Sequence, residues 1–242
     1  MKNIILPASV LFTLLFFWEA IVRLVRIPLY VLPAPSSIFM ALFKDWKILL
    51  FHSTVTLLET FIGLAIAIGL AVILAILMDA FQNFKAAIYP LLVLSQTIPV
   101  IVLAPIFIIY FGFGMTPKII IVVLMCFFPI VVNFADGLKE VDENIVNLIL
   151  SYGANKLQIY SIVKIPASIP SLLSGLRIAA TYSITGAVVG EWLSAQSGLG
   201  YYMLRVKNGY MLDKVFACVV VIVILSLLMN FLVNLTLRRG KK

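Results

Sequence analysis

A few ionisable side chains interrupt the long apolar runs of this 242-residue chain, and they are the first candidates for chemistry. They are Glu59, Arg177 and Glu191, together with Glu19 in the first apolar run. A charge is costly to place in lipid, so residues of this kind commonly mark ion or proton pathways. The competing interpretation is structural, because Glu19 or Glu59 could form an ion pair with Arg177. The sequence leaves both interpretations open.

Uncharged polar side chains inside the same apolar runs are candidates for lining a pathway through the protein. They are Ser95, Gln96, Thr97, Asn133, Thr181, Ser183 and Thr185. Polar residues in membrane spans also hydrogen-bond across helices as simple packing contacts, so a structural role competes with the pathway role for each of them.

Motifs of hydrolytic and metal enzymes are absent from the sequence. There is no G-x-x-x-x-G-K-[ST] loop to cradle phosphates, and the one Gly-Lys pair is Gly240–Lys241 in the basic tail. H-E-x-x-H and G-x-S-x-G are also missing, and His52 alone cannot supply a metal triad. Cys126 and Cys218 fall in apolar runs and are expected to behave as small buried hydrophobes. We therefore expect no enzyme activity and no metal or cofactor bound by this chain.

Composition predicts that membrane-spanning helices position these residues. Hydrophobic residues make up 63% of the chain, charged residues 12%, and the mean hydropathy is +1.16, whereas soluble domains carry about 25% charged residues. The apolar runs match the ~20 residues that cross a bilayer and are too long for barrel strands. The fold class is therefore an all-α polytopic transmembrane bundle with about six spans. They are expected near residues 4–22, 51–78, 86–112, 117–135, 168–190 and 215–237.

Charge bears on topology and partners. The net charge of +8 fits basic loops near anionic lipid headgroups better than nucleic-acid binding. Residues 4–22 contain Trp18 and Glu19 and lack a following small-residue cleavage pattern, so we expect a retained first span. Basic residues are about equally numerous in the segments expected on the two sides of the membrane, so their count alone does not decide the topology. An even number of spans places both termini together, and the tail Arg238, Arg239, Lys241 and Lys242 predicts that this side is cytoplasmic.

Local patterns predict how some spans are shaped. Gly63, Ala67, Ala71 and Ala75 recur every fourth residue, which puts small side chains on one helix face suited to close packing. Pro99 and Pro105 predict a bend in the third span, and the prolines of 27–37 predict an extended connector. The polar interval 191–213 predicts a folded loop or partial re-entrant segment.

The polar segment 136–166 predicts two short helices outside the bilayer, on the cytoplasmic side. Apolar residues at helical spacing precede Gly153, which interrupts the first helix. Asn155 could cap a second helix over Lys156 to Val163, and Pro166 would close it. The pair could form a docking element or lie in the headgroup region, and the pattern does not decide between these.

The segment from Asn147 to Gly200 resembles the inner-membrane permease subunits of bacterial ABC importers. Their signature is E-A-A, three residues, Gly, nine residues and I-x-L-P. In this chain the later positions are filled by Gly153, Val163, Ile165 and Pro166. The E-A-A positions are occupied by Asn147-Leu148-Ile149 instead. Further matches follow the branch for nitrate, sulfonate, taurine and thiamine precursors. They are Leu32–Ser36 (L-P-x-P), Ser95–Pro99, Phe111–Gly114, Ser174–Ala179 (G-L-R-I-A) and Glu191 with Ser197–Tyr201 (E…GLGY).

The resemblance implies a single transmembrane permease domain over 1–242 with a coupling segment at 136–166. It implies that Gly153, Ala154, Leu157 and Pro166 shape the contact with a separate ATPase. The expected partners are two ATPase subunits that use the ATP, an extracytoplasmic solute-binding protein and a second permease copy, as a homodimer in the bacterial inner membrane.

The resemblance also bears on the transported solute. Sulfonate and nitrate permeases often show Arg in an S-L-x-R pattern where this chain has Thr56-Leu57-Leu58-Glu59. Together with 127–133, this looks more like permeases for thiamine pyrimidine precursors or riboflavin than for sulfonate, taurine or nitrate. Two alternatives remain from the residues alone. One is a proton-coupled secondary transporter using Glu59, Glu191 and Arg177, and the other is a membrane scaffold without transport.

Overall fold

The structure is a helical bundle with enough apolar helices for six membrane crossings. The computed structural model describes residues 2–194 and 196–239, and this part of the chain contains helices and no strand. The helices that could each span a bilayer are α1 (Lys2–Leu24), α3 (Trp46–Ala80), α6 (Thr116–Lys139), α9 (Ile165–Ser194) and α11 (Leu212–Arg239). A bent pair, α4 (Gln82–Thr97) and α5 (Val100–Phe111), gives a sixth candidate when the two helices are counted as one span. The predicted all-α polytopic bundle is confirmed.

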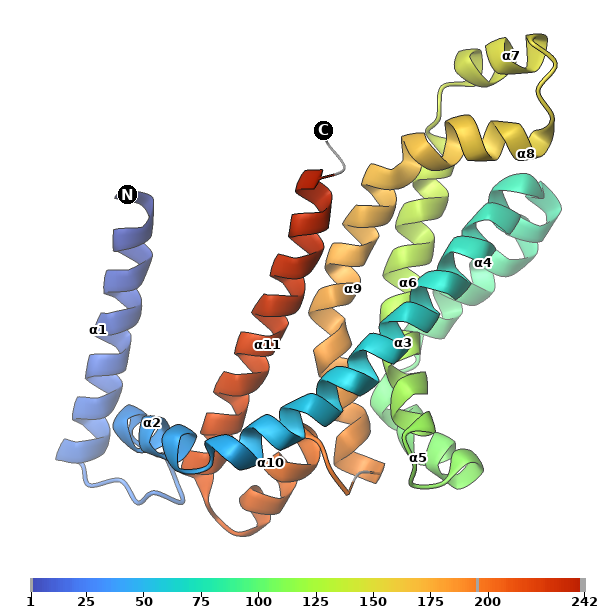
Figure 1. Ribbon diagram of the computed structural model, residues 1–242. Helices are drawn as coiled ribbons and strands as arrows, with labels where there is room; N and C mark the ends of the chain where they lie inside the picture. Colours follow the sequence, from blue (N-terminus) through green and yellow to red (C-terminus); the bar gives the residue numbers. More distant parts are fainter. Residues whose placement is uncertain (1, 195, 240–242) are drawn as a thin grey trace.

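The remaining helices mark the two ends of the bundle (Figure 1). The start of α1 and the end of α11 lie at the same end as α7 (Glu143–Ser151) and α8 (Lys156–Ile159), which we call the α7–α8 end. The helices α2 (Pro35–Lys44) and α10 (Leu199–Asn208) lie at the opposite end, called the α10 end. This arrangement agrees with an even number of crossings. Lys241 and Lys242 of the basic tail lie outside the described residues.

The core of the bundle is α6, which packs between α3 and α9. Two glycines permit this close approach. A Cβ on Gly63 of α3 would lie 2.6 Å from the Cβ of Val122, and one on Gly175 of α9 would lie 2.6 Å from the carbonyl oxygen of Pro129. Side chains of any size at these positions would push the helices apart, so the glycines set the spacing of the core.

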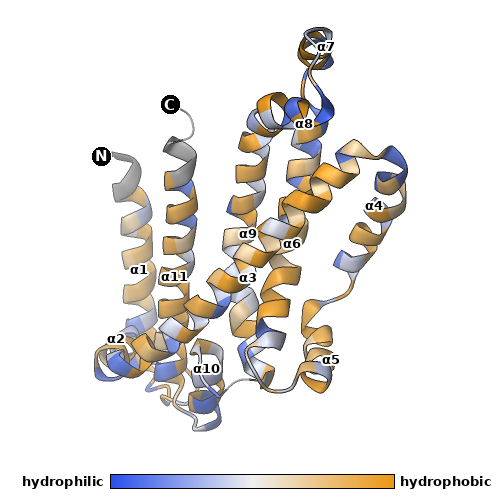
Figure 2. Cartoon of the chain, turned by 45° about the vertical axis from the view of Figure 1, so that its right-hand side comes forward, coloured by the Kyte–Doolittle hydropathy of each residue, from blue (hydrophilic) through white to orange (hydrophobic). Residues whose placement is uncertain are grey.

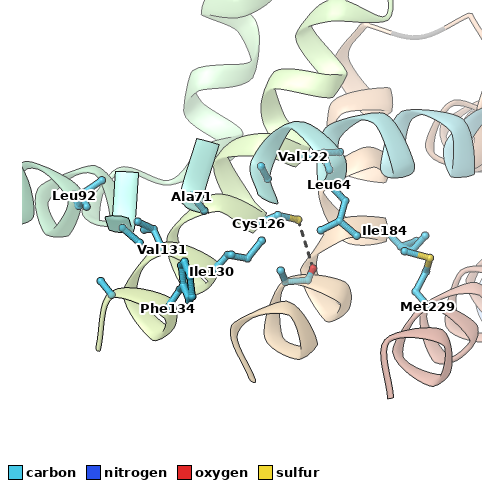
Figure 3. Packing of buried hydrophobic residues seen from close by; sticks show 14 of the residues in the cluster. Leu64, Ala71, Leu92, Val122, Cys126, Ile130, Val131, Phe134, Ile184 and Met229 are labelled. Atoms are coloured by element: carbon cyan, nitrogen blue, oxygen red, sulfur yellow. Dashed lines mark hydrogen bonds between the residues drawn. The ribbon is translucent and has the colours of Figure 1, made fainter. Parts of the chain in front are cut away.

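Buried side chains that range in size from alanine to phenylalanine fill the interface (Figure 3). Ala67, Ala71 and Ala75 of α3 are fully buried, which confirms the packing face expected from their spacing. Cys126 lies in the same cluster, where its Sγ is 3.4 Å from the carbonyl oxygen of Ala179, and Cys218 is also buried. The expectation that both cysteines behave as buried hydrophobes is confirmed.

Most of the helices are hydrophobic along much of their length (Figure 2). Large apolar side chains are exposed on the outside of the bundle; on α1, for example, Phe12 is 74% exposed and Phe16 is 63% exposed. A soluble domain rarely exposes apolar patches of this extent, whereas hydrocarbon chains solvate them well. The surface is therefore that of a protein embedded in lipid.

The crossing expected at 86–112 is more sharply bent than the sequence predicted. Its two halves, α4 and α5, meet at 98° because both Ile98 and Pro99 adopt extended backbone angles. Proline lacks the N–H that would continue the helical ladder and disfavours helix in the residue before it. Pro105, by contrast, lies inside α5 without ending it.

Two boundary predictions are wrong. Pro166 does not close a helix, because α8 runs through a π-helical turn (η1, Tyr160–Lys164) directly into α9. A π turn widens the helix locally and accommodates the missing N–H, so the proline is tolerated in the first turn of α9. The extended connector at 27–37 is also shorter than expected, since Pro35 starts α2 at a position that suits proline.

The glycine contact of the core gives a matched test on one helix. Gly63→Val should destabilise the bundle by about 1–3 kcal/mol through overpacking against Val122. Gly69→Val on the same helix meets nothing within 4 Å and should have little effect. The measurement is the temperature at which each purified variant loses its monodisperse size-exclusion peak in detergent. Equal midpoints for the two variants would contradict this account of the core.

Candidate functional site

A cavity of about 410 Å³ opens between the α4–α5 break, α6 and α9. Ser95 and Gln96 from α4 and Asn133 from α6 supply its polar groups. Phe128 from α6 and Tyr182 from α9 supply aromatic rings. The volume lies in the range of small-molecule sites, and no charged side chain is among the described residues that line it.

Some of the hydrogen-bonding groups that line the cavity have no partner in the described protein and are available to a solute. The Ser95 hydroxyl donates to the carbonyl oxygen of Leu92 at 2.7 Å, and the Asn133 amide nitrogen donates to that of Pro129 at 2.8 Å. Within the described chain, the amide oxygen of Asn133 and the amide of Gln96 have no hydrogen-bond partner. These groups can both donate and accept, which suits a neutral polar ring.

The other predicted pathway residues lie outside this cavity. The hydroxyl of Thr97 bonds within its own helix, and Ser183 is fully buried with its hydroxyl on the carbonyl oxygen of Ala180. Thr181 pairs with Asn230 of α11 at 3.1 Å, and Thr185 is exposed on α9. Phe128 and Tyr182 were not among the sequence candidates, because an aromatic residue in a span carries no sign of which face it occupies.

A hydrogen-bond network fixes the start of α10. Three consecutive backbone N–H groups are captured by side chains of α3 and α9. Gly198 donates to His52 Nδ1 at 3.0 Å, Leu199 donates to Thr56 Oγ1 at 2.9 Å, and Gly200 donates to Glu191 Oε2 at 2.6 Å. The first N–H groups of a helix lack internal partners, so these bonds satisfy donors that would otherwise be buried without one.

Glu191 is the centre of this α10 network. Its Oε1 accepts the Thr56 hydroxyl at 2.6 Å, which joins α9 to α3 as well as to α10. Gly198 has φ +111, a conformation that L side chains rarely adopt, and a Cβ there would collide with the Glu191 carboxylate. The E…GLGY pattern therefore encodes a carboxylate and the glycine backbone that fits around it.

Beside this network lies a buried ion pair that sequence reasoning did not identify. Lys118 Nζ is 2.6 Å from Glu59 Oε1, and both side chains are buried. α6 begins at Thr116, so Lys118 lies in its first turn, where it faces α3. Glu19 pairs with Arg23 of its own helix at 2.5 Å. The suggested pairing of Glu19 or Glu59 with Arg177 is therefore wrong.

A second polar contact anchors α10 from its other side. Asp45 Oδ2, at the junction of α2 and α3, accepts the Tyr202 hydroxyl at 2.7 Å and lies 2.6 Å from Lys214 Nζ. Burial alone would raise the pKa of Asp45, but the bonds from Lys214 and Tyr202 outweigh it and hold that pKa below 3.8. Burial and the neighbouring carboxylate raise the pKa of Tyr202. The carboxylate stays ionised and joins α10, α11 and the α2–α3 corner.

At the opposite end, α7 and α8 form a small exposed helical pair. Asp142 caps α7, and Asn155 forms a capping box with Gln158 at the start of α8, as the sequence suggested for Asn155. Gly153, between the helices, has φ +84 and open space around it. Tyr152 and Leu157 are each 81% exposed. An apolar surface at the end of the bundle is typical of a contact with another protein.

The pair is tied to the bundle through Asp79 at the end of α3. Its carboxylate accepts the Tyr160 hydroxyl at 2.6 Å and lies 2.6 Å from Lys164 Nζ. Gly153, Ala154 and Leu157 thus lie together beyond this anchor, whereas Pro166 lies past it on α9. Across residues 2–194 and 196–239, no three His, Cys, Asp or Glu side chains gather where they could hold a metal ion.

Comparison with known proteins adds a family and a set of relatives. The family model "Binding-protein-dependent transport system inner membrane component" matches residues 63–242. A formylaminopyrimidine transport permease protein of Halalkalibacterium halodurans is 41% identical over 92% of this chain and 89% of its own length. A probable ABC transporter permease protein of Haemophilus influenzae is 34% identical over 96% of this chain and 95% of its own length.

A solved structure shares the fold. The MetNI methionine ABC transporter, in an inward-facing conformation, matches with a TM-score of 0.62 at 19% identity. The match covers 81% of this chain and 95% of the other. At that identity the likeness concerns the arrangement of the helices alone.

The α10 network provides a second matched test. Gly198→Ala should detach α10, because the substitution combines a strained φ with a collision at Glu191, at an expected cost of about 1–3 kcal/mol. Gly209→Ala, at the other end of the same helix, has φ −85 and only ordinary contacts, so it should be neutral. Limited proteolysis of the α9–α10 connection in detergent measures the difference. If both variants resist cleavage like the parent protein, Gly198 does not hold α10.

Proposed function

The chain belongs to the binding-protein-dependent transport system inner membrane components and is a permease subunit of an ABC importer, and we propose that it carries a formylaminopyrimidine-like thiamine precursor into the cytoplasm. It is a multi-pass protein of the bacterial inner membrane. The observation that carries the substrate proposal is the 41% identity, over most of both chains, to a formylaminopyrimidine transport permease. Family membership replaces the proton-coupled transporter and scaffold alternatives.

The chemistry of the cavity supports an uncharged heterocycle as the solute. The amides of Gln96 and Asn133 can donate to ring nitrogens and accept from an exocyclic amine or a formamide N–H. Phe128 and Tyr182 offer aromatic surface on which a flat ring can pack. A pathway must also release its cargo, and a few neutral hydrogen bonds with one or two ring contacts are weak enough to permit this.

The α7–α8 pair is the proposed docking site for a separate ATPase. Its exposed apolar residues, Tyr152 and Leu157, can bury against a partner, and Gly153 and Ala154 form the turn that presents them. Pro166, on α9, would set the direction in which this segment leaves the bundle. ATP would be bound and hydrolysed by the ATPase, and this chain would bind no cofactor and catalyse no reaction.

The assembly proposed from the family is an importer with two such permeases, two ATPase subunits and a solute-binding protein. The α7–α8 end would face the cytoplasm, where ATP is available, and the α10 end would face the binding protein. A homodimer is the simplest arrangement, in which two copies of this chain over 1–242 enclose the pathway.

Transport by reconstituted importer tests the substrate. The permease, its ATPase and its binding protein in proteoliposomes should accumulate labelled formylaminopyrimidine only when ATP is supplied to the ATPase. Riboflavin and an alkanesulfonate, offered at the same concentration, serve as comparison solutes. ATP-dependent accumulation of either of these in place of formylaminopyrimidine would reject the assigned substrate while retaining the importer.

Coupling through Gly153 has a matched control at the opposite end. Gly153→Val should reduce the ATPase recovered with the affinity-purified permease about tenfold, because a side chain at φ +84 costs about 1–2 kcal/mol and would reshape the turn. Gly112→Val also places a side chain at a positive φ, here +72, and in open space, but in the α5–α6 turn at the α10 end. Its ATPase recovery should match that of the parent protein. Equal recovery with both variants would remove Gly153 from the contact.

A further inference from the structure

One face of α9 is polar although it is exposed in the middle of the bundle. Ser174, Arg177, Thr181 and Thr185 follow one another at spacings of three and four residues, which places them on one side of the helix. All four are exposed, whereas Ala179, in the same helix, is fully buried against α6. A helix face that met only lipid would be apolar, and many large apolar side chains are exposed on the other helices of this bundle.

Arg177 lies midway along α9 between the polar contacts at the two ends of the bundle. It comes 13 residues after Lys164, which binds Asp79 at the α7–α8 end, and 14 residues before Glu191, which binds α10 at the other end. At 1.5 Å per residue, each of these polar layers is about 20 Å away along α9. The backbone of Arg177 is therefore about equally far from both ends of the bundle.

This guanidinium has no carboxylate to neutralise it in the described structure. Four acidic residues of the described spans are already engaged, Glu59 by Lys118, Glu19 by Arg23, Asp79 by Lys164, and Glu191 by Thr56 and Gly200. The other two, Asp136 near the end of α6 and Asp213 at the start of α11, form no ion pair with Arg177. No ion pair to Arg177 exists in residues 2–194 and 196–239. An arginine at this depth is strongly disfavoured against hydrocarbon and is found instead facing water or another polar surface.

The cavity borders this helix face without including it. Ile178 and Tyr182, which line the cavity, are adjacent to Arg177 and Thr181 on α9 and are 43% and 47% exposed. A solute in the cavity would therefore lie beside the face that carries Arg177. Water that enters the cavity would reach this face too.

We propose that Arg177 is a fixed positive charge facing the aqueous pathway, where it excludes cations while neutral solutes pass. The proposal rests on the proposed role of the cavity as part of the pathway. When the pathway fills with water, an uncompensated cation raises the energy of inorganic cations and cationic solutes and lowers that of anions. A neutral pyrimidine is unaffected by this charge to first order, so the importer would turn over without dissipating cation gradients.

Thiol chemistry measures this charge directly. Cys126 and Cys218 are both buried, so a cysteine introduced at Thr181, one turn from Arg177, would dominate the reaction with polar thiol reagents. The Thr181→Cys variant is treated in the assembled importer, in right-side-out and inverted membrane vesicles. The probes are an anionic sulfonatoethyl and a cationic trimethylammonioethyl methanethiosulfonate, and each rate is divided by the rate with a small free thiol.

The anionic reagent should react about tenfold faster than the cationic one after this correction, since both probes pass within about 6 Å of the guanidinium in water. Adding Arg177→Gln should bring the ratio close to one, and Arg177→Lys should restore most of it. Leu227→Cys on the apolar face of α11 should react with neither reagent, because that side chain is 64% exposed on a surface that faces lipid.

Three results would overturn the proposal. Thr181→Cys could be unreactive from both sides of the membrane, which would mean that the face is not aqueous. The two reagents could react equally while Arg177 is present, as expected if a carboxylate of a second copy neutralised it. The ratio could also remain tenfold after Arg177→Gln, which would assign the field to other charges. Failure of the substrate proposal would appear separately, as missing formylaminopyrimidine uptake with the reagent ratio intact.

Discussion

The close packing of α6 between α3 and α9 is the contact on which the rest of the structure depends. Gly63 and Gly175 let the helix backbones approach, and the buried alanines of α3 continue the same seam toward the α7–α8 end. In lipid there is little hydrophobic force to drive helices together, so close van der Waals contact must supply the association. Because α6 is held in this way, Lys118 near its start meets Glu59, and Asn133 farther along it faces the cavity.

The buried carboxylates described above lie near the two ends of the bundle, and each has hydrogen-bond or ion-pair partners there. At the α10 end, Glu59, Glu191 and Asp45 bind lysines, hydroxyls and helix N–H groups. At the other end, Asp79 binds Lys164 and Tyr160. A buried ion pair adds little to stability by itself, but removing one partner leaves a charge that lipid cannot solvate. These pairs therefore fix which helices meet.

Much of the fold was predictable from the sequence because the length of an apolar run is enough to identify a membrane-spanning helix. The spans, the small-residue face of α3, the cap at Asn155 and the break at Gly153 all follow from local rules that lipid enforces. Tertiary choices were not predictable in the same way. Glu59 could have paired with any cation at its depth, and only the packing of α6 selects Lys118 over Arg177. Likewise, the helix is interrupted before Pro99 but continues past Pro166, which follows a π-helical turn. The conformation of the neighbouring backbone sets this difference.

The ties at the two ends make α3 and α9 a closed frame. α3 is 35 residues long, about 50 Å. Near one end it is joined to α9 by the hydrogen bond between Thr56 and Glu191. At the other end it is joined to the helix leading into α9 by the ion pair between Asp79 and Lys164. The α4–α5 pair lies outside this frame, since α4 packs on α3, and α5 packs on α6 and α9. The cavity lies where the frame meets this sharply bent pair, so some of its walls belong to the frame and others to helices outside it. A displacement of α4 against α3 would alter the cavity while leaving both sets of ties intact, which is the mechanical property that a pathway opening to alternate sides requires.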